Sequence, residues 1–437
     1  MNANAPIKPP LAIDTLVLHG GTFRTDPATS AVAVPIYQTT SFAFESTEKA
    51  KRISRFEEIA YTYSRVANPT VDAFEQRLAQ LEGGVAALGI ASGQAATAVA
   101  VLALVQAGDN IVASQGLYGG TVNFFRERLK QFGIEARFVD STDPENFRRA
   151  TDGRTRLYFG ETLPNPKLTV FPIREVADIG RPLGIPLIID NTASPLAAKP
   201  LDHGAAIVVY SATKYIGGHG TTIGGAIVDG GNFPWADFPE RQPLINNPDP
   251  AYDNRSYVEL AAALGGPIAY VVRARAAIVR DLGPSLSPQN AFQLIQGLET
   301  LPLRLERHFS NARTVAEFLS RHPKVARVIF PGLQTGEDKR RADTYLSGGY
   351  GALIGFEPTG GEQSALAFID NLKLVYHLAN IGDARTLAIH PFSTTHGQLS
   401  EAEKAAAGVT PAFVRLSIGI ENPVDIIADI EQALARV

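Results

Sequence analysis

The chain has 437 residues, of which 45% are hydrophobic and 19% charged, a composition typical of a globular protein long enough for two domains. Its formal net charge of -4 gives no electrostatic reason to expect a nucleic acid or an anionic membrane as a partner. The absence of cysteine excludes disulfides, thiolate zinc sites and a cysteine nucleophile.

Neither a membrane span nor an export signal is expected from the sequence. The longest nearly apolar stretch, Ala95 to Val105, is too short to cross a bilayer. Residues 1–10 lack the charged start and the apolar run of a signal peptide, so we expect a cytoplasmic protein. The eight histidines are scattered and none forms H-E-x-x-H, so no metal site is expected.

Residues 1–62 contain no long periodic segment that could build a core. We therefore predict an arm that lies on another surface, such as that of a neighbouring subunit. A helix should follow, because Asn68 suits an N-cap and Pro69 the first helical position. Tyr63 and Arg65 stand just before this start. The predicted apolar face of the helix consists of Val71, Phe74, Leu78 and Leu81.

Strand-like apolar runs recur along the next part of the chain. They occupy residues 85–91, 111–113, 136–139, 156–160, 186–190, 206–210 and 223–228. Most are separated by segments of helix length, which predicts an α/β fold with a largely parallel sheet and helices on both faces. Ligands of such sheets bind beyond the carboxyl ends of the strands. The residues that follow the strands are therefore the candidates for a site.

Several of these strand ends carry polar residues that suit a ligand. Ser92-Gly93-Gln94 opens a helix whose exposed N–H groups suit an anion, although the same pattern describes a plain N-cap. Tyr118 could stack on a planar ring, although a single tyrosine is more often part of the core. Asn165 lies between two prolines in a rigid turn, where an asparagine is also common for structural reasons.

Asp190 ends the buried apolar run 187–189. A carboxylate in that place is costly unless a positive group compensates it. A protonated pyridine nitrogen would do so, and the pair would keep the ring an electron sink. An aspartate that caps the next helix is the structural alternative.

The segment 207–225 passes from an apolar run to hydroxyls, one lysine and a cluster of glycines. We interpret it as a strand that delivers Lys214, flanked by Ser211 and Thr213, into a phosphate-lined pocket. An amine out of bulk water loses its proton more easily than a surface lysine and can attack an aldehyde. The glycines would let the backbone approach a bulky ligand closely. The candidate ligand is pyridoxal phosphate (PLP).

Two other interpretations of Lys214 must be weighed. A lysine after a strand is most often a solvated charge. Tyr210 and Lys214 also have the Y-x-x-x-K spacing of short-chain dehydrogenases, which are hydride-transferring oxidoreductases. That class needs a helix at 210–214 and a glycine-rich dinucleotide turn, and the chain contains no G-x-G-x-x-G. We therefore prefer the PLP interpretation.

The remainder of the chain predicts a second, smaller α+β domain. A helix-rich segment at 290–322 is followed by short strands and a closing helix at 424–437. Arg415 stands among the apolar residues of a strand, and its guanidinium fork suits the carboxylate of an amino acid. A structural salt bridge is the alternative. The predicted division is an arm at 1–62, a large domain at 63–283 and a C-terminal domain at 284–437.

Together these residues resemble the Cys/Met-metabolism family of PLP enzymes, from His19 to the C-terminal helix. The motifs that carry the resemblance, in the family's order and spacing, are Tyr63-Ser64-Arg65 with Asn68-Pro69-Thr70, Ser92-Gly93-Gln94, Leu117-Tyr118-Gly119, Asp190-Asn191-Thr192 and Ser211-Ala212-Thr213-Lys214. The resemblance implies fold type I of the PLP-dependent transferases, which is aspartate aminotransferase-like, with a mainly parallel sheet and a smaller C-terminal domain.

The resemblance also implies roles for the residues that bind the cofactor. Lys214 would bond to PLP and later shuttle protons, and Asp190 would hold the pyridine nitrogen. Tyr118 would stack on the ring and act as a second acid or base, and Asn165 would bond the ring hydroxyl. The predicted cofactor site is completed by Ser92, Gly93, Gln94, Thr192, Ser211 and Thr213, most of which would hold the phosphate.

Further roles follow for the substrate and for a second subunit. By the resemblance, Arg415 would bind the substrate carboxylate, and Asn380 and Tyr63 would lie beside the substrate. Tyr63 and Arg65 would reach the phosphate of the neighbouring subunit. A homo-oligomer, usually a tetramer with shared active sites, is therefore expected.

Within the family the sequence is most similar to the O-acetylhomoserine sulfhydrylases. The similarity lies in the segments 51–59, 379–383, 394–400 and 407–411, and methionine γ-lyases carry a cysteine in place of Gly120. This implies γ-replacement, in which O-acetyl-L-homoserine and sulfide or methanethiol give homocysteine or methionine and release acetate.

Other activities on the same scaffold stay open at this point. O-succinylhomoserine sulfhydrylases, cystathionine γ-synthases and γ-lyases use the same site, and the shape of loop-built pockets decides between them. Phe392 stands where a small residue is expected, which bears on the ester and thiol preference. A binding module without activity is disfavoured because Lys214, Asp190 and Arg415 are all present.

Overall fold

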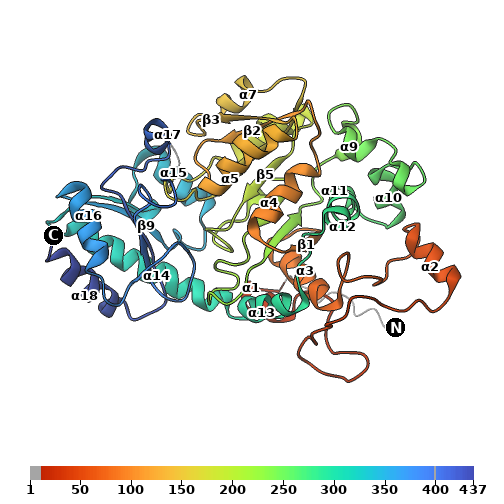
Figure 1. Cartoon of the computed structure of the whole chain (residues 1–437), viewed down its shortest axis with the longest axis horizontal. Helices are drawn as coiled ribbons and strands as arrows, with labels where there is room; N and C mark the ends of the chain where they lie inside the picture. Colours follow the sequence, from red (N-terminus) through yellow and green to blue (C-terminus); the bar gives the residue numbers. More distant parts are fainter. Residues whose placement is uncertain (1–10, 398–399) are drawn as a thin grey trace.

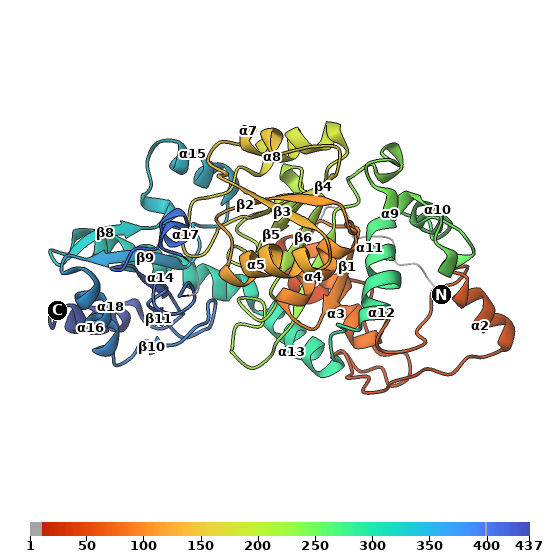
Figure 2. The ribbon, with the colours of Figure 1, turned by 45° about the horizontal axis from the view of Figure 1, so that its top comes forward.

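The computed structural model describes residues 11–397 and 400–437. A seven-stranded sheet forms the centre of the molecule, and a five-stranded sheet lies toward the C-terminal end (Figures 1 and 2). Residues 1–10 of the predicted arm and residues 398–399 of the 394–400 segment lie outside the described residues.

The large sheet has the strand order β1-β7-β6-β5-β4-β2-β3. Its strands are β1 (Ala86–Ile90), β2 (Asn110–Ser114), β3 (Glu135–Val139), β4 (Thr155–Glu161), β5 (Leu187–Asp190), β6 (Ile207–Tyr210) and β7 (Gly225–Asp229). Only β7 runs against its neighbours, and the other strands are parallel to one another. Every apolar run predicted as a strand is one, so the predicted α/β architecture is confirmed.

Helices bury both faces of this sheet, which explains why its strands are continuously apolar. In β6, Ile207 and Val209 pack in one core cluster and Val208 and Tyr210 in another. One face is covered by α4 (Gly93–Leu102), α5 (Gly119–Asn123), η1 (Phe124–Arg128), α6 (Leu129–Gln131), α11 (Ala269–Arg273) and η6 (Ala274–Val279). The short α12 (Arg280–Leu282) follows η6 and buries none of its residues. The opposite face is covered by α3 (Pro69–Glu82), α7 (Glu145–Arg149), α8 (Ile173–Gly180) and α13 (Pro288–Glu299).

The predicted helix after Tyr63 and Arg65 is α3, and its start has the expected chemistry. The side chain of Asn68 accepts the N–H of Thr70 at 2.9 Å, and Pro69 occupies the first turn. Gly83 ends the helix with φ 82°, a left-handed conformation that glycine adopts without steric cost. The helix packs against β1 and α13.

The smaller sheet has the order β10-β11-β12-β9-β8, in which only β10 and β11 pair in parallel. Its strands are β8 (Val325–Ile329), β9 (Leu353–Pro358), β10 (Tyr376–His377), β11 (Leu387–Ile389) and β12 (Val414–Ser417). The helices of this region are α14 (Leu301–Arg321), α15 (Gly336–Tyr345), α16 (Gly361–Asp370), α17 (Glu401–Ala406) and α18 (Pro423–Leu434). The predicted smaller α+β region is therefore present. Its boundary at residue 284 stays a prediction, because α13 lies beyond that residue but packs on α3.

The N-terminal segment runs along the outside of this body. The helix α1 (Ile13–His19) packs on α3, whereas α2 (Thr47–Ser54) stands at the far edge of the molecule and buries none of its residues (Figure 1). Phe56 anchors the segment after α2 by an edge contact to Tyr252, with ring centroids 5.2 Å apart. Contact with another subunit stays a prediction.

The remaining helices are short. They are η2 (Arg181–Leu183), η3 (Pro200–His203), η4 (Trp235–Asp237), α9 (Pro243–Asn246), η5 (Pro250–Tyr252), α10 (Tyr257–Ala263) and η7 (Pro331–Leu333). Within residues 11–397 and 400–437, no helix is long and apolar enough to cross a membrane. In the same part of the chain, no three histidine or acidic side chains gather as a metal site would require.

Candidate functional site

A cavity of about 340 Å³ lies at the carboxyl ends of the parallel strands. The large sheet region contributes Ser92, Gly93, Gln94, Tyr118, Glu161, Asn165, Asp190, Thr192, Ser211, Thr213 and Lys214 to its lining. The C-terminal region contributes Asn380, Thr395 and Arg415, among others. The cavity thus brings together every predicted cofactor and substrate residue except Tyr63 and Arg65.

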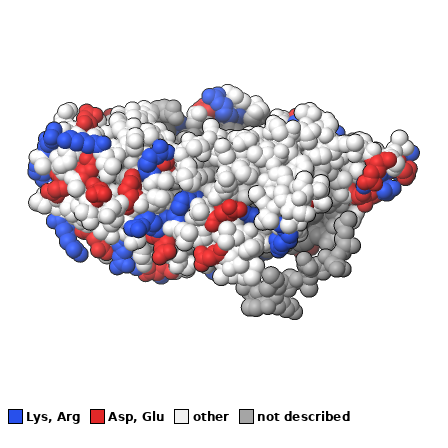
Figure 3. Space-filling view, turned by 90° about the horizontal axis from the view of Figure 1, so that it is seen from below, with Lys and Arg blue, Asp and Glu red and all other residues white. Residues whose placement is uncertain are grey.

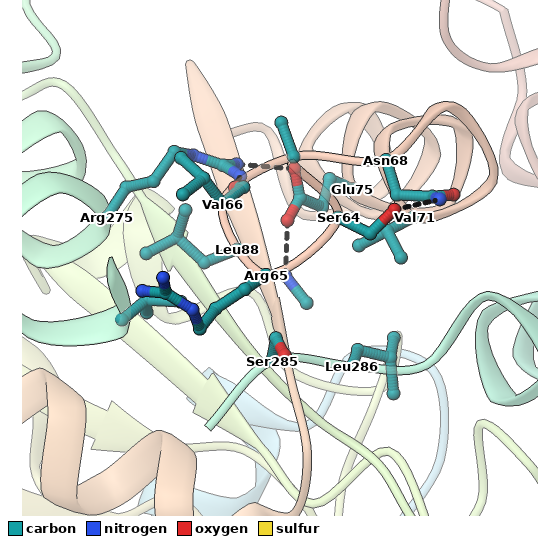
Figure 4. Close-up of a pocket in the computed structure, with 13 residues that line it drawn as sticks. Ser64, Arg65, Val66, Asn68, Val71, Glu75, Leu88, Arg275, Ser285 and Leu286 are labelled. Carbon is teal, nitrogen blue, oxygen red and sulfur yellow. Dashed lines mark hydrogen bonds and ion pairs between the residues drawn. The ribbon is translucent and has the colours of Figure 1, made fainter. Parts of the chain in front are cut away.

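Tyr63 and Arg65 lie apart from this cavity. The Tyr63 side chain is 42% exposed, and the Arg65 guanidinium lies 5.3 Å from the centre of its ring. Arg65 lines a different and much smaller hollow (Figure 4). Within a single chain, therefore, these two residues do not contribute to the cavity.

Lys214 lies in the turn that follows β6. Its backbone N–H donates to the Ser211 carbonyl at 3.2 Å, and its Nζ donates to Asn380 Oδ1 at 2.6 Å. Burial lowers the pKa of Lys214, and the nearby Arg415 cation lowers it further. The amine therefore loses its proton more readily than that of a surface lysine.

Two backbone turns form one end of the cavity. Ser92 caps α4 by accepting the N–H of Ala95 at 3.1 Å, and Thr192 Oγ1 accepts the N–H of Ser211 at 2.7 Å. The turns approach so closely that a Cβ on Gly93 would lie 2.4 Å from the Ser211 Cβ. Only glycine fits there. Hydroxyls, backbone N–H groups and the start of α4 converge in this place, which suits a phosphate.

Two carboxylates lie side by side on another wall. Glu161 of β4 and Asp190 of β5 are register partners at the ends of neighbouring strands. Burial raises the pKa of both groups, and the Asp190 charge raises that of Glu161 further. Within the described part of the chain, neither forms an ion pair with a lysine or arginine. A ligand with a cationic group would therefore be favoured at this wall.

Arg415 lies in β12 and is only 4% exposed. Its Nη1 donates to Asn165 Oδ1 at 3.1 Å and its Nη2 to the Asn380 carbonyl at 2.8 Å, whereas its buried Nε has no partner. Burial lowers its pKa to about 10, so the guanidinium still carries its charge at neutral pH. It suits a carboxylate that enters the cavity.

Tyr118 lines the cavity and is exposed. Its backbone N–H donates to Glu161 Oε1 at 2.6 Å, so the buried carboxylate holds the start of α5. A Cβ on Gly120 would lie 2.5 Å from the Tyr118 ring, so the ring can occupy its position only because residue 120 has no side chain. Phe392 is not among the residues that line the cavity, and its ring centre lies 4.1 Å from the Lys404 Nζ.

The structure is inconsistent with the dehydrogenase interpretation. Residues 207–210 form a strand rather than a helix, so Tyr210 and Lys214 do not share a helical face. The Tyr210 hydroxyl is buried and bonds to Asn191 and to Glu82, away from the cavity.

Glu161 is the charged lining residue that was not predicted from the sequence. It directly follows a predicted strand, as Asp190 does, and this position was the available signal. Thr395 belongs to the segment 394–400, but no local pattern indicated that its side chain lines the cavity.

Comparison with known proteins places the chain in a family. The family model for the Cys/Met metabolism PLP-dependent enzymes matches residues 14–435. The chain belongs to this family. The O-acetyl-L-homoserine sulfhydrylase of Leptospira meyeri is 50% identical over 430 residues, which is 97% of each chain. The homocysteine/cysteine synthase of Saccharomyces cerevisiae is 45% identical over 441 residues, or 98% of each chain.

A solved structure of a family member extends this similarity to the fold. The crystal structure assigned as an O-acetylhomoserine (thiol)-lyase from Campylobacter jejuni superposes with a TM-score of 0.92 at 39% identity. The match covers 97% of this chain and all of that one. That protein carries a pyridoxyl-lysine phosphate. The predicted family, fold type and dependence on PLP are therefore confirmed.

The residues of the cavity fit PLP. The turn at Gly93 and Ser211 suits its phosphate, the uncompensated carboxylates suit a protonated ring nitrogen, and Lys214 offers an amine of lowered pKa. Which residue holds which atom of the cofactor stays a proposal.

Proposed function

We propose that this protein converts O-acetyl-L-homoserine and sulfide into L-homocysteine and acetate, by PLP-dependent γ-replacement. Methanethiol in place of sulfide would give L-methionine. The names of the curated relatives support this reaction, and one observation of the chain carries it: Lys214 and the Arg415 fork converge on one cavity through Asn380. An amine that can move protons and a group that binds an amino acid carboxylate are thus adjacent.

The substrate would be oriented by Arg415 and Asn380. The carboxylate of O-acetyl-L-homoserine would take the Arg415 fork, whose Nε is unpartnered. Its bonds to Asn165 and Asn380 would keep the guanidinium oriented toward the cavity when the substrate leaves. The α-carbon of the substrate would then lie within reach of Lys214.

Lys214 would move the protons. Its Nζ, held by Asn380, would take the α-proton of the substrate in the neutral form that burial and Arg415 favour. PLP, when bound, supplies an aldehyde that bonds to amines and a ring that withdraws electrons from the α-carbon. Tyr118 would be the second acid or base, for the proton at the β-carbon. Loss of that proton would expel acetate from the γ-carbon. Sulfide would then add at the γ-carbon, and Tyr118 and Lys214 would return protons to the β- and α-carbons.

The carboxylates would set the charge of the ring. Asp190 would face the pyridine nitrogen, and its ionised form would be favoured by that cation despite burial. Asn165, which also accepts from Arg415, would bond the ring hydroxyl and so join cofactor and substrate sites.

We infer further that the active protein is a homo-oligomer with sites shared between subunits. Tyr63 and Arg65 are exposed, and Val32 and Ile59 of the same N-terminal segment are among the most exposed apolar side chains. Figure 3 shows few charged side chains on the upper part of the middle of one face, between the C-terminal end and the tip at α2, whereas the lower part carries several. Such surfaces favour contact with a second subunit.

The proposal is tested by absorbance and product formation. Purified holoprotein should show a visible band that changes when O-acetyl-L-homoserine is added, and homocysteine should appear only with sulfide. Lys214→Ala should lose both the band of the lysine-bound cofactor and all turnover. Wild-type turnover by this variant would contradict the proposal. So would a wild-type protein that is active on O-succinyl-L-homoserine but inactive on O-acetyl-L-homoserine.

A further inference from the structure

An ion pair outside the cavity fixes the segment that carries Tyr63 and Arg65. Arg275 of η6 donates through Nη2 to Glu75 Oε2 at 2.5 Å and through Nη1 to the Val66 carbonyl at 2.6 Å. Figure 4 shows the two side chains pointing toward one another beside Val66. Glu75 lies in α3 and is 4% exposed, whereas the Arg275 side chain is 28% exposed, so the pair is buried on its carboxylate side.

The same carboxylate reaches the strand that enters the phosphate turn. Glu75 Oε1 accepts the backbone N–H of Gly89 at 2.7 Å. This N–H belongs to β1, the edge strand of the large sheet, and Ser92-Gly93 follows shortly after. One buried carboxylate therefore joins the Tyr63–Val66 segment to the strand that leads into this subunit's own cavity.

The segment alternates between anchored and exposed residues. The Ser64 N–H donates to the Thr40 carbonyl at 2.8 Å, and the Asn68 side chain donates to Ser64 Oγ at 2.9 Å. Val66 is held by Arg275. Arg65 lies between these two anchors and Tyr63 directly precedes the first, and both side chains are exposed. Anchoring Ser64 and Val66 therefore restricts the directions in which the Tyr63 and Arg65 side chains can point.

Stability alone does not account for the pair. Buried ion pairs are often no more stabilising than apolar residues of similar size, because the desolvation cost offsets the attraction. Arg275 also lies in a π-helical turn, a geometry that is rare and frequent at functional sites. Both features favour a role in placing the segment.

We propose that Glu75 and Arg275 are positioning residues for the active site of the neighbouring subunit: they hold Tyr63 and Arg65 where these side chains contact that subunit's cofactor phosphate. The inference rests on the proposed sharing of sites between subunits. Neither Glu75 nor Arg275 lines the cavity, so both would act through the residues that they hold.

The first test measures PLP affinity in two variants and a matched control. Arg275→Met removes the contacts to Glu75 and Val66, and Glu75→Gln keeps an acceptor for Gly89 but weakens the pair. In both, PLP affinity should fall about 10- to 100-fold, the effect of losing about one hydrogen bond to a charged phosphate. The control is Arg156→Met, which breaks the buried pair of Arg156 with Asp109, N···O 2.8 Å, outside the cavity. It should leave PLP affinity unchanged.

Mixed oligomers decide whether the effect acts between subunits. Subunits with Lys214→Ala are combined with subunits carrying Arg275→Met, and activity is measured per intact Lys214. If the pair serves the neighbour, the mixture regains activity, because the intact Lys214 is paired with an unaltered Tyr63–Arg65 segment. A pair that only stabilises its own subunit would give no recovery, and that result overturns the proposal.

A parallel mixture separates this inference from the proposed function. Lys214→Ala subunits are also combined with Arg65→Ala subunits. Recovery there but not with Arg275→Met refutes the positioning role alone, whereas failure in both refutes the sharing of sites. If Arg275→Met does not fold, Glu75→Gln replaces it in the same mixture. Wild-type PLP affinity in both variants would likewise overturn the proposal.

Discussion

Replacement of Arg415 by alanine tests the role of the guanidinium in binding the substrate. A carboxylate on the fork would form two charge-assisted hydrogen bonds, each worth about 1.5–3 kcal/mol. Their loss should cost about 3–6 kcal/mol, or roughly 10²- to 10⁴-fold in kcat/KM for O-acetyl-L-homoserine. Most of the effect should appear in KM, because Lys214 keeps its hydrogen bond to the Asn380 side chain. A smaller part should appear in kcat, because the Arg415 cation would no longer lower the pKa of Lys214.

Steady-state kinetics with two substrates give the sharpest readout. The methyl ester of O-acetyl-L-homoserine lacks the carboxylate charge, so wild-type enzyme should discriminate strongly against it and Arg415→Ala should not. Arg415→Lys keeps the charge without the planar fork and should lose about 10- to 100-fold. Arg341→Ala removes another buried arginine, which bonds to Glu337 and the Thr142 carbonyl outside the cavity, and should leave KM unchanged.

The reasoning would be refuted by an unchanged KM in Arg415→Ala. It would also be refuted if this variant discriminated against the methyl ester as strongly as wild-type enzyme does. In either case the two bonds of Arg415 to Asn165 and Asn380 would be purely structural.

Two further predictions concern buried carboxylates. Asp190→Asn keeps the size of the side chain but removes the charge, so kcat should fall at least about 100-fold and PLP should be lost faster on dialysis; wild-type kcat would contradict the role. Asp229 is not among the residues that line the cavity. Burial raises its pKa to about 7, so the folded protein binds a proton there that the unfolded chain, with a pKa near 3.8, releases. Its contribution to stability is therefore present below about pH 4 and is lost as the pH rises toward 7, by up to about 4 kcal/mol. Asp229→Asn should raise the melting temperature relative to wild type more at pH 8 than at pH 5, and an equal difference at both pH values would contradict this.

Much of the site could be predicted because its signals are local. Asp190 and Lys214 each follow an apolar run within a few residues, and Asn68-Pro69 has the chemistry of a helix start. The alternation of strands and helices then placed the strand ends at one edge. These inferences need only the order of residues along the chain and the rule that parallel strands end together.

The features that were missed depend on pairing between distant segments. Glu161 matters because β4 pairs with β5 in a register that brings it beside Asp190, and no local pattern sets that register. The reversed direction of β7 and the packing of α13 on α3 are likewise decided by tertiary contacts. Asn380 could be predicted only from the family resemblance, because its bond to Lys214 joins residues 166 positions apart in the sequence.

The charges of the cavity explain why it would bind a ligand such as PLP or an amino acid. Burial raises the pKa of Asp190 and Glu161 and lowers that of Lys214 and Arg415, so all four groups are displaced toward their neutral forms. The carboxylates stand at the ends of β4 and β5, and the cations come from the turn after β6 and from β12. A ligand with a cationic group at the first pair and anionic groups at the second relieves both displacements at once. Without a ligand, the buried charges are poorly solvated and destabilise the fold locally. A ligand that places an opposite charge beside each pair offsets this cost when it binds. The arrangement therefore selects ligands with charges of both signs.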